Sequence, residues 1–252
     1  MRVPWPPDFP DVIIHTDVRA RDAHPAYVAA KSGDADAAVQ LVIDLINPTA
    51  LESLCVLAAA DAVLILPVTA EEAAGFNAIP DALADHLAGA LAKPAALGEI
   101  VQTNKVGHTR AKAFQRLVTP PTFDGYVVSG ANYLLVDDHV GLGGTLANLR
   151  GHVELNGGHV IGMTALTESR DGRCISLRPA TLNMLWEKHG EALDELWQAQ
   201  FGYGIDCLTE VEAQILCRQP TVDAIEDFLA QAAVEARRRG VEAAIGSKGQ
   251  DA

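Results

Sequence analysis

Two adjacent carboxylates followed by a glycine-rich turn are the residues of this chain best suited to chemistry. Asp137 and Asp138 come directly after the apolar run 133–136, and the glycine-rich turn 141–145 follows them. Ionised carboxylates only accept hydrogen bonds, and a sugar diol offers two donors. A glycine turn that opens a helix presents backbone N–H groups to a phosphate. Together these residues predict a site for a phosphorylated sugar.

The residues around this motif predict the elements that must position it. The apolar run 133–136 does not alternate with polar residues, which is typical of a strand buried on both faces of a parallel sheet. Apolar residues at helical spacing predict a helix from Thr145 that ends at Gly157-Gly158, and 159–165 has the composition of the next strand. In an open α/β sheet, ligands bind at the carboxyl ends of the strands. The alternative is an ordinary strand-to-loop turn, which Asp-Asp before glycine also fits.

The run 134–146 resembles the diphosphate-sugar motif of type I phosphoribosyltransferases, in which an apolar strand precedes two acids, two variable residues and a small Thr/Gly-rich loop. The resemblance implies that Asp137 and Asp138 contact the ribose hydroxyls of phosphoribosyl pyrophosphate (PRPP). It also implies a loop that binds the 5′-phosphate, formed by Gly141, Leu142, Gly143, Gly144 and Thr145. Leu142 stands where family members usually carry a threonine, so one hydroxyl to the phosphate is missing. Gly141 stands where purine-salvage members place an acid, which excludes an Asp base at that position.

A basic window lies upstream of the acids. Residues 100–123 contain no Asp or Glu but carry Lys105, Arg110, Lys112 and Arg116. The resemblance places a flexible loop here that closes over the site, with Lys105 and Arg110 as catalytic cations. Such cations would stabilise the charge that develops on pyrophosphate as it leaves. A solvated helix face over 110–117 is the alternative interpretation.

An earlier strand is predicted over 61–69, and it continues into a loop. The resemblance implies that this loop contacts pyrophosphate through Pro67, Val68, Thr69 and Ala70. A helix is expected to follow and to end near Leu91. Gly75-Phe76-Asn77 resembles a segment of the ComF-like branch of the family, although that branch usually has an arginine before it and this chain has Ala74.

The flanking sequence is expected to be mostly helical. A short strand is expected at 12–15, and helices at 25–31 and 34–45, with Asn47-Pro48 ending the second helix. Towards the C-terminus, helices are predicted from Thr181 to about Gln200 and from Val222 to the Arg237-Arg238-Arg239-Gly240 segment. Thr209 with Glu212 forms a predicted capping box.

The chain is therefore expected to be an α/β protein with a doubly wound, mainly parallel sheet of the type I phosphoribosyltransferase kind and helical N- and C-terminal additions. The expected parts are a mostly helical extension over 1–60, the phosphoribosyltransferase-like core over 61–170, and a helical region over 171–252 with a disordered tail.

Composition excludes several classes of function. The formal net charge is −14, which argues against nucleic acid as a main partner. We also expect no membrane partner, because the sequence contains no apolar run long enough to span a bilayer. The N-terminus lacks the apolar stretch of a signal peptide, and the 4 cysteines show no metal-site spacing, so a cytoplasmic protein with reduced thiols is expected.

The resemblance implies a phosphoribosyltransferase of nucleotide metabolism, which would transfer the phosphoribosyl group from PRPP to a nitrogenous base or similar small-molecule acceptor and release pyrophosphate. Mg²⁺ would neutralise the charge of the pyrophosphate and take much of its coordination shell from the substrate. We therefore expect no dedicated protein metal site. Because dimers are common among members of that family, the resemblance also allows a homodimer. The alternative is a non-catalytic protein that senses PRPP and regulates a partner. Leu142 favours the sensor, and the basic window favours the enzyme.

Overall fold

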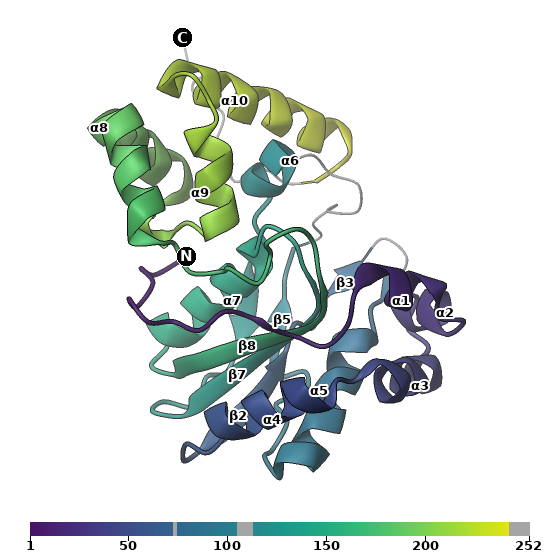
Figure 1. Ribbon diagram of the computed structural model, residues 1–252. Helices are drawn as coiled ribbons and strands as arrows, with labels where there is room; N and C mark the ends of the chain where they lie inside the picture. Colours follow the sequence, from purple (N-terminus) through teal and green to yellow (C-terminus); the bar gives the residue numbers. More distant parts are fainter. Residues whose placement is uncertain (73–74, 105–112, 242–252) are drawn as a thin grey trace.

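A parallel sheet forms the centre of the protein in the computed structural model, which describes residues 1–72, 75–104 and 113–241. The four strands lie in the order β1 (Ile13–Ile14), β8 (His159–Glu168), β7 (Asn132–Val140) and β2 (Val63–Pro67), and every pairing is parallel (Figure 1). The two longest strands, β7 and β8, are adjacent in the sheet. Parallel strands require crossover connections, and here helices supply them.

Helices cover both faces of this sheet. On one face α5 (Ile79–Leu91) packs with α3 (Ala35–Leu45) and α4 (Pro48–Leu57), and on the other lies α7 (Gly144–Leu155). Side chains of β7 alternate between the two cores: Leu134 and Val136 face α5, whereas Tyr133 and Leu135 face α7. The predicted doubly wound α/β fold is therefore confirmed. Among the described residues, no single helix is both long and apolar enough to cross a bilayer, while α3 and α4, bent by 96° at their junction, pass that test only as a pair.

The N-terminal region contributes to the sheet as well as to the helices. The expected short strand is β1, and α1 (Val18–Ala23), α2 (Tyr27–Lys31) and α3 follow it. The second predicted helix ends at Asn47-Pro48 as expected, but the same two residues also begin α4, which the sequence interpretation missed. Asn47 Oδ1 accepts the N–H groups of Thr49 (2.9 Å) and Ala50 (3.3 Å), and proline occupies the first turn, where its missing N–H costs nothing.

His15, next to β1, makes stability depend on pH. It is 4 % exposed, and its Nε2 lies 3.1 Å from Thr164 Oγ1. Burial, helped by the nearby His86, lowers the pKa of His15 to about 4. Between pH 6.5 and pH 4, His15 stays neutral in the folded protein, whereas in the unfolded chain it takes up a proton. The free energy of unfolding therefore falls as the pH drops from about 6.5 to about 4.

We expect this loss to total about 3 kcal/mol, at about 1.4 kcal/mol per pH unit, and to be largely absent in His15→Gln. Urea unfolding at pH 7, 5.5 and 4 measures it. His159→Gln, at an exposed position on β8, is the matched control and should keep the wild-type pH dependence. An identical pH dependence in His15→Gln would contradict the assignment.

Two short antiparallel strand pairs accompany the parallel sheet. Antiparallel pairs form between β3 (Glu71–Glu72) and β4 (Gly75–Phe76), and between β5 (Ile100–Gln102) and β6 (Phe123–Gly125). Helix α6 (Ala113–Val118) leads into β6, so the helix expected over 110–117 exists in its described part.

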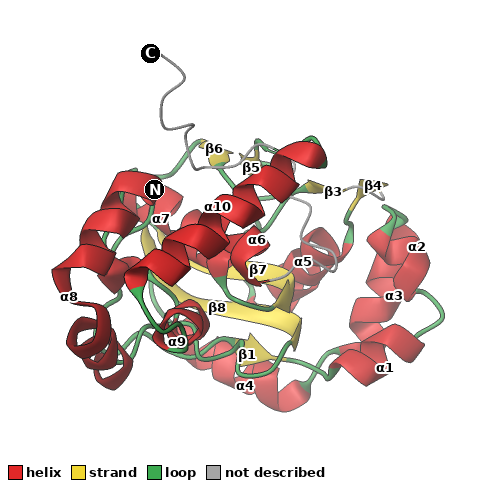
Figure 2. Cartoon of the chain, turned by 90° about the horizontal axis from the view of Figure 1, so that it is seen from above, coloured by secondary structure: helices red, strands yellow, loops and turns green. Residues whose placement is uncertain are grey.

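The C-terminal helices form a separate layer above α6 and α7 (Figure 2). They are α8 (Pro179–Phe201), which is interrupted at Gly190, then the 3₁₀ turn η1 (Ile205–Cys207), α9 (Glu210–Cys217) and α10 (Val222–Arg238). The predicted capping box is confirmed: Thr209 and Glu212 each accept the backbone N–H of the other at the start of α9. These helices share a core with α6 around the fully buried Trp197.

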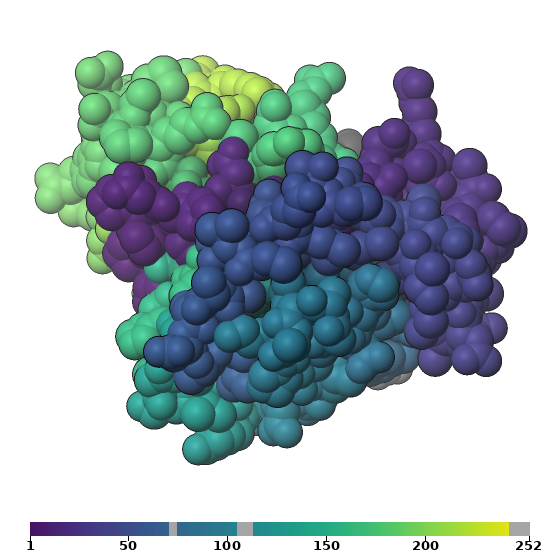
Figure 3. Space-filling view, turned by 60° about the horizontal axis from the view of Figure 1, so that its bottom comes forward, coloured from purple at the N-terminus to yellow at the C-terminus, as the bar shows by residue number. Residues whose placement is uncertain are grey.

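The first residues of the chain tie this layer to the sheet. Trp5 Nε1 donates to the Leu208 carbonyl (2.7 Å), and Arg150 on α7 donates to the carbonyls of Val3 (3.0 Å) and Pro4 (2.9 Å). In Figure 3 the purple N-terminal residues border the green surface of the C-terminal helices. The boundaries expected for the three parts of the chain stay predictions.

Candidate functional site

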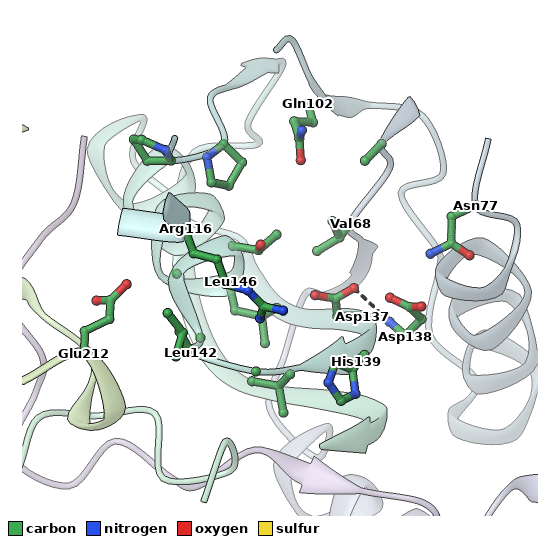
Figure 4. Close-up of a pocket in the computed structure, with 18 of the residues that line it drawn as sticks. Val68, Asn77, Gln102, Arg116, Asp137, Asp138, His139, Leu142, Leu146 and Glu212 are labelled. Carbon is green, nitrogen blue, oxygen red and sulfur yellow. Dashed lines mark hydrogen bonds between the residues drawn. The ribbon is translucent and has the colours of Figure 1, made fainter. Parts of the chain in front are cut away.

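A pocket of about 540 Å³ opens at the carboxyl ends of β2 and β7 (Figure 4). The acid pair and the glycine turn form its floor, and the loop after β2 and helix α6 form one side. Helices α1 and α2 contribute to the wall beyond Asp138, and α9 contributes Glu212 beside the glycine turn. Strands, turns and helices from distant parts of the sequence therefore meet at this edge.

The acids occupy a different local structure from the predicted one. We expected the strand to end before Asp137, but β7 continues to Val140, and Asp137 lies opposite Ala165 of β8. The reason is tertiary: β8 runs on to Glu168, and its ladder holds the acids and His139 in extended backbone. Both acids remain at the carboxyl end of the sheet, line the pocket and are 7 % and 6 % exposed.

The two carboxyl groups differ in their electrostatics. Asp138 Oδ2 lies 2.7 Å from Lys31 Nζ, and the Asp138 N–H donates to Asp137 Oδ1 at 2.8 Å. Burial, together with the neighbouring Asp138 charge, raises the pKa of Asp137 well above its usual range. For Asp138, burial is opposed by the charge and hydrogen bond of Lys31, so its pKa is lowered. The two shifts run in opposite directions: that of Asp138 favours the charged form, which only accepts hydrogen bonds, and that of Asp137 favours the neutral form, which can also donate.

The glycine turn presents backbone N–H donors to the pocket. Among hydrogen bonds between described residues, none is donated by the backbone N–H groups of 141–143. The N–H groups in the first turn of α7 lack intrahelical acceptors because they begin the helix. Arg116 lies over the turn, since a Cβ added to Gly141 would stand 2.7 Å from its Nη1. Backbone donors, a helix N-terminus and a guanidinium therefore face the same part of the pocket, which suits a phosphate.

Gly143 is required by the shape of this turn. Its φ of 83° lies in the left-handed region, and a Cβ there would stand 3.1 Å from Thr209 Cγ2 and 3.2 Å from Ile175 Cγ1. We expect Gly143→Ala to destabilise the fold by about 1–2 kcal/mol and to weaken phosphate binding, because the turn must shift away from α9.

Gly130→Ala is the matched control for this prediction. Gly130 has a φ of 76°, and a Cβ there would meet nothing within 4 Å, so it has the same backbone cost without the crowding. Urea unfolding should show a loss of stability in both variants that is larger in Gly143→Ala, and calorimetric titration with PRPP should show weaker binding only in Gly143→Ala. Equal binding in both would show that the turn does not hold the ligand.

The structure places the remaining predicted residues as follows. Val68 and Ala70 of the predicted pyrophosphate loop line the pocket. Pro67 ends β2 in register with Val136, and Thr69 Oγ1 lies 3.1 Å from Asp81 Oδ1. Leu142, Gly144 and Thr145 of the phosphate loop also line the pocket. Lys105 and Arg110 lie outside the described residues.

Sequence reasoning missed a set of charged residues that the fold brings to the pocket. Five cationic side chains and three anionic ones line it, although the whole chain carries a net charge of −14. The cations are Arg2, Arg21, Lys31, Arg116 and Arg239, and the anions are Asp137, Asp138 and Glu212. The local excess of positive charge suits an anionic ligand. Of the five cations, Arg116 lies in the basic window that the sequence interpretation singled out, and the other four lie outside it.

The donor set fits a magnesium ion that arrives with its substrate. Among the described residues, no group of three or more His, Cys, Asp and Glu side chains is placed to hold a metal. The pocket does offer the two oxygen-bearing side chains of Asp137 and Asp138, and oxygen is the ligand that Mg²⁺ prefers. Phosphate oxygens and water would have to complete the coordination shell.

No family model matches the chain. It is 43% identical over 238 residues to Protein TraN of Escherichia coli, an alignment that covers 94% of this chain and 53% of that protein. It is 40% identical over 153 residues to an uncharacterized protein of Haemophilus influenzae, covering 61% of this chain and 34% of that one. The chain thus spans about half the length of the first relative and a third of the second.

Similar solved structures include an adenine phosphoribosyltransferase, at 16% identity over 52% of this chain and 75% of that one with a TM-score of 0.33. They also include UMP synthase of Leishmania donovani, at 15% identity over 77% of this chain and 35% of that one with a TM-score of 0.30. At such low scores the fold class is assigned from the strand order and direction of the sheet itself.

Proposed function

We propose that this chain binds PRPP with Mg²⁺ and transfers its phosphoribosyl group to a nitrogenous acceptor, releasing pyrophosphate. One observation carries the proposal: a buried acid pair and a glycine turn whose backbone donors have no acceptor among the described residues line the same pocket, with Arg116 over the turn. An acid pair suits a sugar diol, and the turn suits a phosphate, so the two together match a phosphorylated pentose. The solved phosphoribosyltransferases that resemble this chain are too distant to add weight.

Each part of the pocket has a role in the proposed reaction. Asp137 and Asp138 hold the ribose hydroxyls, and the turn 141–145 holds the 5′-phosphate. Lys105 and Arg110, as predicted from the sequence, stabilise the leaving pyrophosphate beside the loop 67–70, and Arg116 lies over the turn that holds the 5′-phosphate. The C1–oxygen bond to pyrophosphate breaks, its electrons leave with the pyrophosphate, and the acceptor nitrogen bonds to C1 through its lone pair. An acceptor that reacts at an N–H gives that proton to the departing pyrophosphate. The bound Mg²⁺ supplies charge neutralisation of the pyrophosphate.

The negative charge of the acid pair also suits the reacting ribose. Positive charge develops on the sugar ring as the C1–oxygen bond breaks, and a carboxylate already in place stabilises it without reorganisation. The pair carries that charge on Asp138, whose pKa the Lys31 ammonium holds below its usual range against the effect of burial.

Pyrophosphate release tests the proposal. The protein is incubated with PRPP, Mg²⁺ and one member at a time of a panel of purines, pyrimidines and pyridines, and released pyrophosphate is measured by a coupled assay. Release that depends on one class of acceptor supports the transferase. The protein with both Asp137 and Asp138 replaced by asparagine is the control for contaminating enzyme.

A second candidate, a non-catalytic PRPP sensor, is favoured by a specific contact. The Lys31–Asp138 ion pair joins α2 to the carboxylate that would hold a ribose hydroxyl, so a diol must compete with Lys31 or share the acid with it. Ligand binding could thereby move α2, which is the behaviour of a sensor. Tight PRPP binding with no pyrophosphate release on any acceptor would select this candidate over the transferase.

A further inference from the structure

Helices α1 and α2 bring three side chains to the wall of the pocket beside Asp138. Arg21, Tyr27 and Lys31 all line it. The Arg21 guanidinium stacks on the Tyr27 ring with 4.7 Å from its carbon to the ring centre, and Lys31 pairs with Asp138 at 2.7 Å. We call these three residues the α1–α2 wall.

Arg21 is held in place yet retains donors. It is 8 % exposed; its Nη1 donates to Thr167 Oγ1 at 2.8 Å, and its Nε and Nη2 donate to Asp22 Oδ1 at 3.0 and 2.8 Å. A guanidinium has five N–H groups, so two of them, one on each terminal nitrogen, have no partner among the described residues. A buried cation with spare donors on a pocket wall is costly unless a ligand completes its hydrogen bonds.

The wall lies where the proposed reaction places its acceptor. In Figure 4, Val68, Gln102 and Arg116 lie on the Asp137 side of the acid pair, whereas Asn77 lies on the Asp138 side. Helix α2 lies on the Asn77 side as well, because the Ala78 N–H donates to the Ala30 carbonyl at 3.2 Å. Displacement at C1 brings the acceptor in opposite the departing pyrophosphate. With pyrophosphate beside the loop 67–70, on the Asp137 side, the acceptor faces the α1–α2 wall.

We propose that the α1–α2 wall selects an acceptor that carries a carboxylate, held by the two spare donors of Arg21 with Lys31 beside it. A guanidinium fork binds a planar carboxylate through two parallel hydrogen bonds, which a neutral ring lacking that group cannot make. The negative charge that would oppose such an acceptor is compensated in part, since Asp138 is paired with Lys31 and Asp22 pairs with Arg21 while 53% exposed. The inference rests on the proposed function, because it names the acceptor class of the same site.

Matched pairs of probes test the proposal by calorimetry. The pairs are nicotinate with nicotinamide and orotate with uracil, each titrated into the protein with and without PRPP and Mg²⁺. We expect the carboxylated member of at least one pair to bind about 10- to 100-fold more tightly than its neutral partner. Arg21→Gln should remove that preference, and the PRPP affinity of the same variant is measured in a separate titration. Arg19→Gln, an exposed arginine on the same helix, removes an equal charge and should retain the preference.

The outcomes separate this proposal from the proposed function, because PRPP affinity is measured independently. If PRPP binds and neither acid is preferred, or if Arg21→Gln retains the preference, the wall is not a carboxylate site. If PRPP does not bind, the proposed function fails, and titration of nicotinate and orotate without PRPP decides about the wall. A preference for the carboxylated probes that depends on Arg21 supports the carboxylate site, and the lack of such a preference overturns it. Should Arg21→Gln misfold by circular dichroism, Lys31→Gln, whose side chain is 26% exposed, is expected to weaken acid binding by a similar factor.

Discussion

Replacing Asp137 and Asp138 together with asparagine is expected to abolish measurable binding of PRPP while the fold persists. A hydrogen bond to the charged Asp138 contributes about 1.5–3 kcal/mol and one to a neutral Asp137 about 0.5–1.5 kcal/mol, so loss of both acids should weaken binding by a factor of about 30 or more. The fold should tolerate the change, because asparagine keeps the volume and an acceptor oxygen, and the Lys31 side chain, 26% exposed, can take up water. Calorimetric titration and thermal unfolding measure the two effects.

A control variant that loses the same number of carboxylates away from the pocket shows whether the effect is specific to Asp137 and Asp138. Asp223→Asn with Asp227→Asn removes two carboxylates from α10, and neither residue lines the pocket. Its affinity for PRPP should match that of the wild type. Undiminished affinity in the Asp137 and Asp138 variant would show that the acids do not hold the ligand.

Arg2→Met is expected to destabilise the protein by about 3–5 kcal/mol, the largest effect on stability that we predict. Arg2 forms a buried two-point ion pair with Glu212, at 2.5 Å from Nη1 and 2.9 Å from Nη2, in which the side chains are 4% and 2% exposed. Removing the arginine leaves the carboxylate buried without its partner, which costs more than the pair contributes. Urea unfolding measures the change.

The double variant Arg2→Met with Glu212→Gln should recover most of this loss, because it removes the buried charge while glutamine can still cap Thr209. Arg239→Met is the control, since its pair with Glu235 is exposed and should contribute under about 1 kcal/mol. A loss in Arg2→Met no larger than in Arg239→Met would mean that the pair is not desolvated. A large loss would establish that the start of the chain anchors α9 beside the glycine turn.

The parts of the fold that local pattern determines were predicted from the sequence. The unbroken apolar run 133–136 and the helical spacing after Thr145 indicated β7 and α7, since burial on both faces of a sheet and on one face of a helix leaves different periodicities. The capping box at Thr209 is equally local, because its two hydrogen bonds join residues three apart.

Features that depend on distant neighbours could not be predicted in this way. Pairing with β8 keeps the acids within β7, whereas their charge and the glycines after them suggested a turn. Lys31 meets Asp138 across 107 residues of sequence, and Arg2 meets Glu212 across 210. Nothing in the local pattern around any of these four residues shows its partner. The motif alone therefore pointed to Asp137 and Asp138 as candidate binding residues, whereas the charges around them became known only from the structure.

A crystal structure of the protein with PRPP and Mg²⁺ tests the central claim most directly. We predict that the ribose hydroxyls lie within hydrogen-bond distance of Asp137 and Asp138, and that the 5′-phosphate accepts backbone N–H groups of the turn 141–145 beneath Arg116. An unoccupied pocket in crystals grown with millimolar PRPP, or PRPP bound away from the acid pair, would contradict the claim.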